Sequence, residues 1–217
     1  KPGDLLLEVH FKQHPRFQIG ESLLPFNNDL FERLGVTGKL RNTVAIPKHG
    51  AVFVTADESV SHTFRFARHL PQKYASSFQV KREEFDEVLL RNAQAAGVEV
   101  RELTSVVDAD LSDPGRATVR TLSREGASEV LEARFLIDAS GHGAVLGRHL
   151  NAKQEEPALR KIAIFAHYHH VENRAEGLDV GNTVIVVLPD SWFWMIPLSE
   201  GITSVGLVLD RELLVVQ

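Results

Sequence analysis

The chain has 217 residues, of which 43% are apolar and 24% charged, as in ordinary globular proteins with a buried core. Its net charge of −5 argues against a nucleic-acid interface, and the lack of cysteine excludes disulfides, thiolate metal sites and cysteine nucleophiles. No apolar run reaches the roughly 18 residues of a membrane span, and no apolar signal segment opens the chain. We therefore expect a soluble, cytoplasmic protein with neither a membrane nor a nucleic-acid partner.

The first half of the chain alternates strands and helices. Leu5–Val9 is a short apolar run, typical of a strand buried in a parallel sheet. Glu21–Leu34 has helical periodicity and is followed by Gly35, a common helix terminator. Thr43–Ala56 predicts two strands joined at a bend, and Val80–Ala96 is the clearest helix of the chain.

The second half is richer in strands. A strand at Val98–Leu103 precedes residues 104–133, whose Asp-Pro-Gly and Glu-Gly turns predict an antiparallel meander. Phe135–Gly141 predicts a buried strand that runs into a small-residue turn, and a short helix follows near Val145–Leu150. Four strands of an antiparallel sheet are expected in the last third: Lys161–His170, Asn182–Leu188, Trp192–Pro197 and Thr203–Asp210.

These elements predict an α/β fold in which a nucleotide-binding part and an antiparallel sheet are interleaved along the chain. Apolar runs lie at both termini, Leu5–Val9 and Leu213–Val216, and indicate a chain truncated at both ends.

The segment Trp192–Pro197 contains both tryptophans of the chain, at positions i and i+2. In a strand these two side chains point to the same face. Alone, the pair could simply pack against a sheet. Its pattern W-x-W-x-I-P, however, resembles the signature of flavin-dependent halogenases.

Two further segments match that family in the same order along the chain. Arg16–Pro25 contains Gly20-Glu21-Ser22 and resembles the family's G-E-S loop; by residue chemistry alone, Ser22 would be the cap of the following helix. Arg82, at the start of a predicted helix, lies in a string that resembles V-x-R-x-x-F-D, and a solvated surface arginine is the alternative.

Two acidic positions complete the cofactor motifs. Asp138–Gly141 resembles the family's D-A-S-G turn, with a tight turn capped by Asp138 as the alternative. Glu8 follows an apolar strand, where dinucleotide-binding units hold a ribose with an acid. The glycine-rich fingerprint that should precede Glu8 is absent, so a surface acid is the alternative there.

The resemblance implies a p-hydroxybenzoate-hydroxylase-like fold. It predicts an FAD-binding Rossmann-like domain from residues 1–42 and 78–150, without its G-x-G-x-x-G segment, and a β-rich substrate-side domain from residues 43–77 and 151–217. It also implies that a set of residues contacts FAD: Glu8, Arg16, Gly20, Glu21, Ser22, Arg82, Val106, Asp138 and Gly141.

The activity that the resemblance implies is halogenation of an electron-rich aromatic substrate, either free or bound to a carrier protein. Reduced FAD from a separate flavin reductase, O2 and halide would give hypohalous acid. Lys48, in a string that resembles K-x-G-A-x-F, would relay this acid, although most lysines are solvated loop residues. A wall of Trp192, Trp194, Ile196 and Pro197 would separate flavin from substrate. The halide site would lie outside this chain.

Other readings stay open. A related FAD monooxygenase or a geranylgeranyl-reductase-like enzyme shares the cofactor motifs, and a cofactor-free fragment could serve as a binding module. His167, His169 and His170 lack a carboxylate at ligand spacing, so we expect a half-exposed strand there and no metal.

Overall fold

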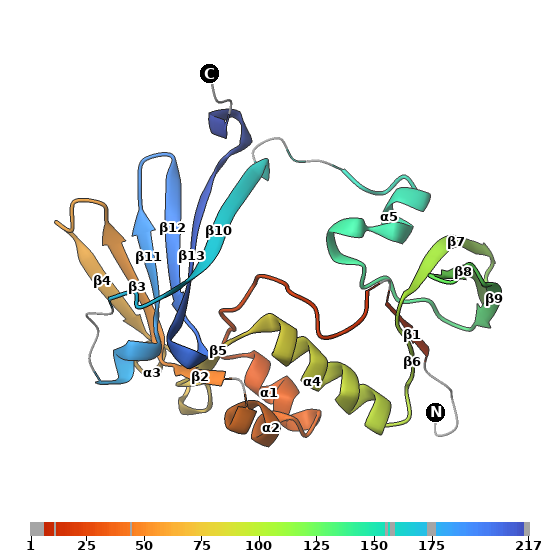
Figure 1. Ribbon diagram of the computed structural model, residues 1–217, viewed down its shortest axis with the longest axis horizontal. Coiled ribbons are helices and arrows are strands. Elements are labelled where there is room, and N and C mark those ends of the chain that lie inside the picture. The colour runs from red at the N-terminus through yellow and green to blue at the C-terminus, as the bar shows by residue number, and fades with distance from the viewer. Residues whose placement is uncertain are drawn as a thin grey trace. The chain divides into compact units, whose positions relative to one another are not determined.

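The computed structural model describes residues 7–10, 12–43, 45–154, 156, 159–172 and 177–214. The chain forms two compact units (Figure 1): unit 1 comprises residues 1–16 and 93–157, and unit 2 comprises residues 17–92 and 158–217. These boundaries differ from those predicted for an FAD-binding and a substrate-side domain. The assignment of a function to each domain stays a prediction.

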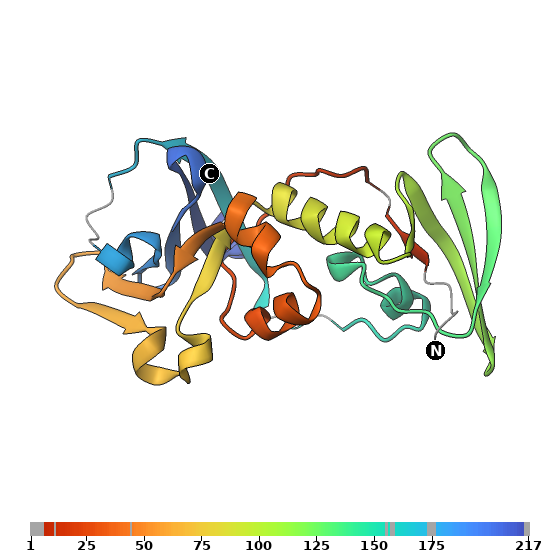
Figure 2. The same cartoon turned by 90° about the horizontal axis from the view of Figure 1, so that it is seen from below.

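Unit 1 contains two small sheets. β1 (Leu7–Val9) runs parallel to β6 (Glu99–Arg101), in keeping with the parallel strand that its apolar sequence predicts. The predicted meander follows (Figure 2) as β7 (Thr104–Asp113), β8 (Arg116–Ser123) and β9 (Ser128–Ala133). The 3-10 turn η2 (Gly141–Gly143) then leads into α5 (Val145–His149), at the predicted position of a short helix.

The strand predicted at Phe135–Gly141 is wrong. Residues 135–140 form no strand, and the side chains of Phe135 and Ile137 are 82% and 80% exposed. A buried strand needs neighbouring strands to pair its backbone N–H and C=O groups. Among the described residues, no strand pairs with this segment, so its apolar composition does not produce the predicted strand.

Unit 2 contains a six-stranded sheet with the order β10-β13-β12-β11-β3-β4 (Figure 1). Its last-third strands are antiparallel neighbours, as predicted, whereas β11 and β3 are parallel. The strands are β3 (Gly50–Thr55), β4 (Ser61–Arg65), β10 (Lys161–His169), β11 (Thr183–Val187), β12 (Ser191–Pro197) and β13 (Ile202–Asp210).

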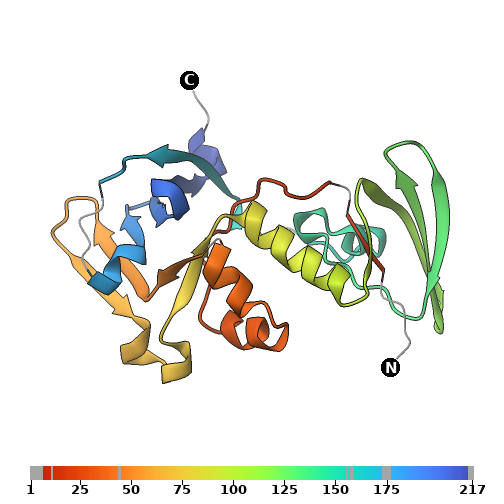
Figure 3. The same cartoon turned by 60° about the horizontal axis from the view of Figure 1, so that its bottom comes forward.

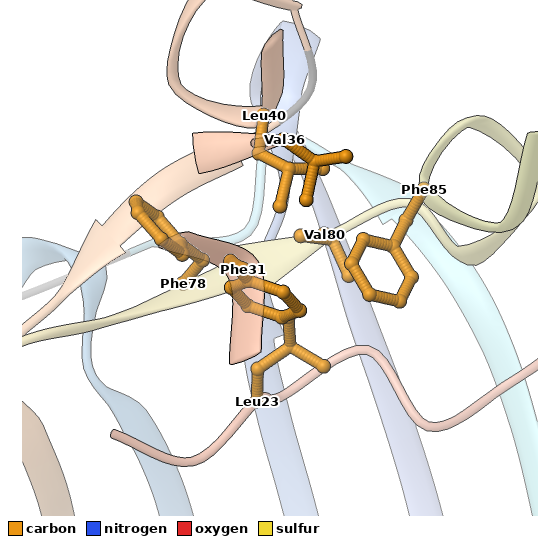
Figure 4. Packing of buried hydrophobic residues seen from close by; sticks show 7 residues of the cluster. All are labelled: Leu23, Phe31, Val36, Leu40, Phe78, Val80 and Phe85. Atoms are coloured by element: carbon orange, nitrogen blue, oxygen red, sulfur yellow. The ribbon is translucent and has the colours of Figure 1, made fainter. Parts of the chain in front are cut away.

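A second part of unit 2 packs helices against the two-stranded sheet of β2 (Ala45–Lys48) and β5 (Ser77–Val80). These helices are α1 (Asn27–Arg33), α2 (Thr37–Thr43) and α4 (Arg82–Ala95), visible together in Figure 3. Side chains of the three helices, of β5 and of the loops beside α1 converge in one apolar core (Figure 4): Leu23, Phe31, Val36, Leu40, Phe78, Val80 and Phe85. Short helices complete the unit: α3 (Phe66–His69), η1 (Gln72–Tyr74), η4 (Gly177–Gly181), η5 (Ser199–Gly201) and η6 (Arg211–Leu214).

The helix predicted from Glu21 to Leu34 is too long at its start. α1 begins only at Asn27, because the preceding segment pairs with β5: Val80 donates to the carbonyl of Glu21 and Leu23 donates to that of Phe78. Backbone groups engaged in such pairing are not free for helical hydrogen bonds. The predicted glycine stops are confirmed, because Gly35 and Gly97 follow α1 and α4 with φ of +67° and +94°. None of the helices in the described ranges is long and apolar enough to cross a bilayer.

Candidate functional site

Unit 2 has an open cavity of about 680 Å³ over one face of its large sheet. The floor comes from alternate side chains of β3, β11 and β12, and the loop before α1, the end of β2 and residues of β4 and α3 form the walls. The lining is Ile19, Gly20, Glu21, Ser22, Leu24, Lys48, Ala51, Phe53, Phe64, Phe66, Thr183, Ile185, Trp192, Trp194 and Ile196. Of the site residues predicted from the sequence, this cavity brings together the G-E-S loop, Lys48 and three residues of the tryptophan segment.

Arg82 fastens the loop that carries Gly20. Its Nη1 donates to the carbonyl of Ile19 at 2.9 Å, and Nε and Nη2 form a bidentate pair with Asp86 at 2.8 and 3.0 Å. Gly20 has φ of +99°, and a Cβ there would lie 2.9 Å from Nη1 of Arg82. The loop therefore passes directly over the guanidinium group. Whether Arg82 also contacts a flavin stays a prediction.

Ser22 does not cap a helix, contrary to the alternative that residue chemistry favours. It forms a backbone bridge with Gln79 on β5, and its Oγ accepts a 2.7 Å hydrogen bond from Nζ of Lys48. Ser22 therefore lies in the cavity wall and not at a helix end, since α1 begins five residues later.

Lys48 is 4% exposed at the end of β2. Besides Ser22, its Nζ donates to the carbonyl of Leu23 at 3.2 Å and lies 5.4 Å from the centroid of the Phe66 ring. Burial disfavours the charged form of an amine, and it lowers the pKa of Lys48 to about 8. An ammonium has three N–H donors, and two of them have acceptors among the described residues.

A chain of hydrogen bonds extends from Ser22 into the interior. Oγ of Ser22 and Oγ1 of Thr183 are 2.8 Å apart, and Nε2 of Gln79 donates to Oγ1 of Thr183 at 2.9 Å and to the carbonyl of Gly181 at 3.0 Å. Because Gln79 donates to Thr183, the hydroxyl hydrogen of Thr183 is available to Ser22. Sequence reasoning missed Thr183 and Gln79, since both are ordinary strand residues until β5 and β11 meet.

Glu21 is buried and pairs with a histidine. Its Oε1 lies 2.7 Å from Nε2 of His167 on β10, and its Oε2 has no hydrogen-bond partner within the described ranges. The sequence predicts only a half-exposed strand around His167. Its role as the partner of Glu21 was missed, because the two residues are separated by 146 positions.

The two tryptophans lie on the same side of β12, as strand alternation predicts. Their rings are 5.9 Å apart and both line the cavity, with Trp194 buried and Trp192 39% exposed. Nε1 of Trp194 donates to Oγ of the fully buried Ser204 at 3.1 Å. A Cβ at Gly206 would come within 2.2 Å of the Trp194 indole, so this glycine leaves room for the ring. Ile196 lines the cavity and Pro197, paired with Thr203, does not.

The remaining predicted cofactor residues belong to unit 1, and none of them lines the cavity: Glu8, Arg16, Val106, Asp138 and Gly141. Glu8 accepts a 2.8 Å hydrogen bond from His10, and Val106 pairs with Thr121 in the meander.

Asp138 serves a local turn. Its carboxylate accepts hydrogen bonds from the backbone N–H groups of Ser140 and Leu146, both at 2.9 Å. Hydrogen bonds from Ser140 and Leu146 lower the pKa of Asp138. Asp138 thus stabilises the turn before α5, which is the structural alternative considered for it; a contact with FAD stays a prediction.

The chain is similar to proteins that are already known. The family model described as tryptophan halogenase matches residues 65–214. A curated relative, the 1H-pyrrole-2-carbonyl-[peptidyl-carrier protein] chlorinase of Pseudomonas fluorescens, is 27% identical over 91% of this chain and 48% of its own length.

Two solved structures share the fold over 97% of this chain. The flavin-dependent halogenase CmlS has a TM-score of 0.88 at 36% identity, with 38% of its length covered. A flavoprotein/dehydrogenase from Cytophaga hutchinsonii has a TM-score of 0.88 at 30% identity, with 51% covered. The chain thus spans about half or less of the length of these relatives.

Proposed function

Since this chain belongs to the tryptophan halogenase family of flavin-dependent halogenases, we propose that it forms part of an enzyme that uses reduced FAD, O2 and halide to halogenate an electron-rich aromatic substrate. The observation that carries the proposal is the composition of one cavity of unit 2. It combines an intact W-x-W-x-I-P strand, a buried lysine and the G-E-S loop.

The cavity wall fits part of a flavin. It offers flat aromatic surfaces together with Oε2 of Glu21, which has no hydrogen-bond partner among the described residues. A planar ring system with polar edges can use both kinds of contact. We propose that Gly20, Glu21, Ser22 and Arg82 of unit 2 hold the flavin. A contact of FAD with the unit 1 residues Glu8, Arg16, Val106, Asp138 and Gly141 stays a prediction from the family resemblance. When bound, reduced FAD would supply O2 activation and halide oxidation.

Lys48 would then handle the oxidised halogen. With a pKa of about 8, the amine is mostly protonated near neutral pH but has a substantial neutral fraction. The ammonium can donate a hydrogen bond to hypohalous acid, and the neutral amine can form a haloamine with it. Ser22 and the carbonyl of Leu23 hold Nζ in one place, which favours a fixed direction of transfer to the substrate.

The tryptophan segment would form a barrier. Trp194 is fixed by Ser204 and by the close approach of Gly206, so its ring presents a rigid surface to the cavity. Large rigid rings exclude water and bulky molecules. We propose that Trp192, Trp194 and Ile196 keep the substrate away from the flavin, with Pro197 ending the segment.

The partners follow from the reaction and from one relative. Reduced FAD would come from a separate flavin reductase, and we propose that the protein works with it in the cytoplasm, beside the NADH pool. The Pseudomonas relative is named for a pyrrole carried on a peptidyl-carrier protein, so a carrier-bound pyrrole belongs among the candidate substrates, with free phenols and indoles.

The test is a turnover assay of the intact protein with FAD, a flavin reductase, NADH and chloride or bromide. The substrates are phenols, indoles, pyrroles and a carrier-bound pyrrole, and products are identified by mass spectrometry. We expect a halogenated product that is lost in Lys48→Ala and kept in Lys39→Ala, which changes an exposed lysine. A hydroxylated product, or peroxide release without halogenation with either halide, contradicts the proposal.

The second candidate is an FAD monooxygenase or a reductase of the geranylgeranyl-reductase type. The likeness to a flavoprotein/dehydrogenase at a TM-score of 0.88 favours it, and hydroxylated or reduced products in the same assay would identify it. Protein that stays colourless when mixed with FAD would instead favour a cofactor-free binding module.

A further inference from the structure

The Glu21–His167 pair links the cavity wall with the surface of unit 2. Glu21 is 1% exposed and lines the cavity, whereas the His167 side chain is 29% exposed on β10. Oε1 of Glu21 and Nε2 of His167 are 2.7 Å apart, which is hydrogen-bond distance. One end of the pair is therefore buried in the wall and the other end reaches water.

The buried end has a free oxygen. Oε2 of Glu21 has no hydrogen-bond partner within the described part of the chain. An unpaired buried carboxylate oxygen is costly. Oε2 has almost no accessible surface of its own, but Glu21 belongs to the cavity wall, so a molecule in the cavity is the available partner. A carboxyl group there can exchange a proton with the cavity contents.

The exposed end is suited to proton exchange with water. The Phe17 ring packs edge-on against the His167 ring, with the ring centroids 5.5 Å apart. This contact restricts the imidazole while part of it stays in solvent. Imidazole accepts a proton on one nitrogen and releases one from the other.

Halogenation consumes a proton. One aromatic C–H group, one halide ion, O2, FADH2 and one H⁺ give the aryl halide, FAD and two water molecules, so each halide must be accompanied by a proton from solvent. We propose that Glu21 and His167 form the relay that delivers this proton to the cavity; the proposal rests on the proposed halogenase function. Glu21 releases the proton on Oε2 as Oε1 takes the proton on Nε2 of His167, and Nδ1 of His167 takes a proton from a hydronium ion in solvent. Rotation of the carboxyl group and a turn of the imidazole ring restore the starting state.

The other polar chain of the wall does not provide this route. From Lys48 it passes through Ser22 and Thr183 to Gln79 and the carbonyl of Gly181. Gln79 is fully buried and cannot titrate. That chain therefore orients Lys48 and has no acid or base at its far end.

The first part of the test uses turnover of the intact protein under the halogenation conditions above. His167→Ala should lower the rate of product formation about 10²-fold, the lower range for loss of general acid–base transfer. Added imidazole should restore the rate in a saturable way, because the site opens to solvent. His169→Ala, an exposed histidine two residues along β10, is the matched control and should neither slow the reaction nor respond to imidazole. Glu21→Gln should be slow and should not be rescued.

The second part uses the resting protein without FAD or substrate. Proton NMR should show a downfield imidazole N–H resonance that is absent in His167→Ala, moved upfield in Glu21→Gln and kept in His169→Ala. This readout reports on the hydrogen bond itself and does not depend on activity.

The outcomes separate the relay from the proposed function. Three results would overturn the relay and leave the proposed halogenase function intact. They are a wild-type rate in His167→Ala, a lowered rate that imidazole does not restore, and an N–H resonance that is unchanged in Glu21→Gln. Wild-type protein that makes no halogenated product would overturn the proposed function, and the relay would fall with it even where the resonance is present.

Discussion

The predicted site residues are held in different ways in the two units. In unit 2, Glu21, Ser22 and Lys48 lie in a cavity wall and bond to residues far away in the sequence. In unit 1, the described partners of the Asp138 carboxylate, which are Ser140, Leu146 and Gly147, all lie close to it in the sequence. The first arrangement fixes side chains in the wall of a cavity, whereas the second stabilises a turn. The two units should therefore respond differently to substitution, and four variants test this difference.

The largest expected effect concerns Lys48. Its pKa is lowered to about 8 by burial, below the value near 10.4 of a solvated lysine. The unfolded chain then binds more protons between these values, so the free energy of unfolding should rise as pH increases from about 8 to 10.4, by up to about 3 kcal/mol. Lys48→Met should lack this rise.

Urea unfolding of wild type and variant across this pH range measures the effect. The difference between the two proteins isolates Lys48 from other groups that titrate at high pH. Lys39→Met, an exposed lysine on α2, is the control and should keep the rise. If the free energy of unfolding changed with pH in the same way in wild type and in Lys48→Met, the Lys48 amine would be solvated.

The next effect concerns Gly206, under the Trp194 indole. A Cβ there would lie 2.2 to 2.5 Å from three ring atoms, so Gly206→Ala should lower the free energy of unfolding by about 2–3 kcal/mol through overpacking. Gly143→Ala in unit 1 is the matched substitution, because its new Cβ would meet atoms only at 3.5 Å; it should change stability little. Equal costs at the two sites, measured by urea unfolding, would contradict the contrast between the units.

A smaller effect is expected at Thr183. Thr183→Val keeps the shape but removes the hydroxyl between Gln79 and Ser22, and should cost about 1–2 kcal/mol of unfolding free energy. The pH dependence of amine acylation at Lys48, followed by mass spectrometry, should shift as well, since Ser22 loses its second partner. Thr183→Ser is the control and should restore both properties; a variant indistinguishable from wild type in both would show that the chain does not orient Lys48.

The sequence predicts local elements well and long-range contacts poorly. The meander, the glycine stops and the four strands of the last third follow from turn residues and periodicity. The predicted start of the first helix at Glu21 and the predicted strand at Phe135–Gly141 are wrong. Both depend on whether a distant strand is present to pair with the backbone.

The same limit applies to the site. Family motifs located Glu21, Ser22 and Lys48, and all three line one cavity. The residues that hold them, Thr183 and His167, carry no local signal, because their roles arise only when β11 and β10 come to lie beside the loop. The roles of the predicted residues in binding FAD stay predictions.

The smallest effect is expected at Asp138. Hydrogen bonds from Ser140 and Leu146 lower its pKa, so the stability it contributes is present above the ordinary aspartate value and is lost as pH falls through the lower pKa of the folded protein. The group is exposed, so Asp138→Asn should reduce the melting temperature only slightly at neutral pH, and the difference from wild type should vanish in acid. Scanning calorimetry from pH 7 to pH 3 measures this, with Asp113→Asn, whose carboxylate likewise accepts a local N–H from Gly115, as the control for a generic turn. A large, pH-independent loss in Asp138→Asn would mean that this carboxylate does more than stabilise a turn, and the contrast between the units would then fail at the position where the D-A-S-G motif predicts a cofactor contact.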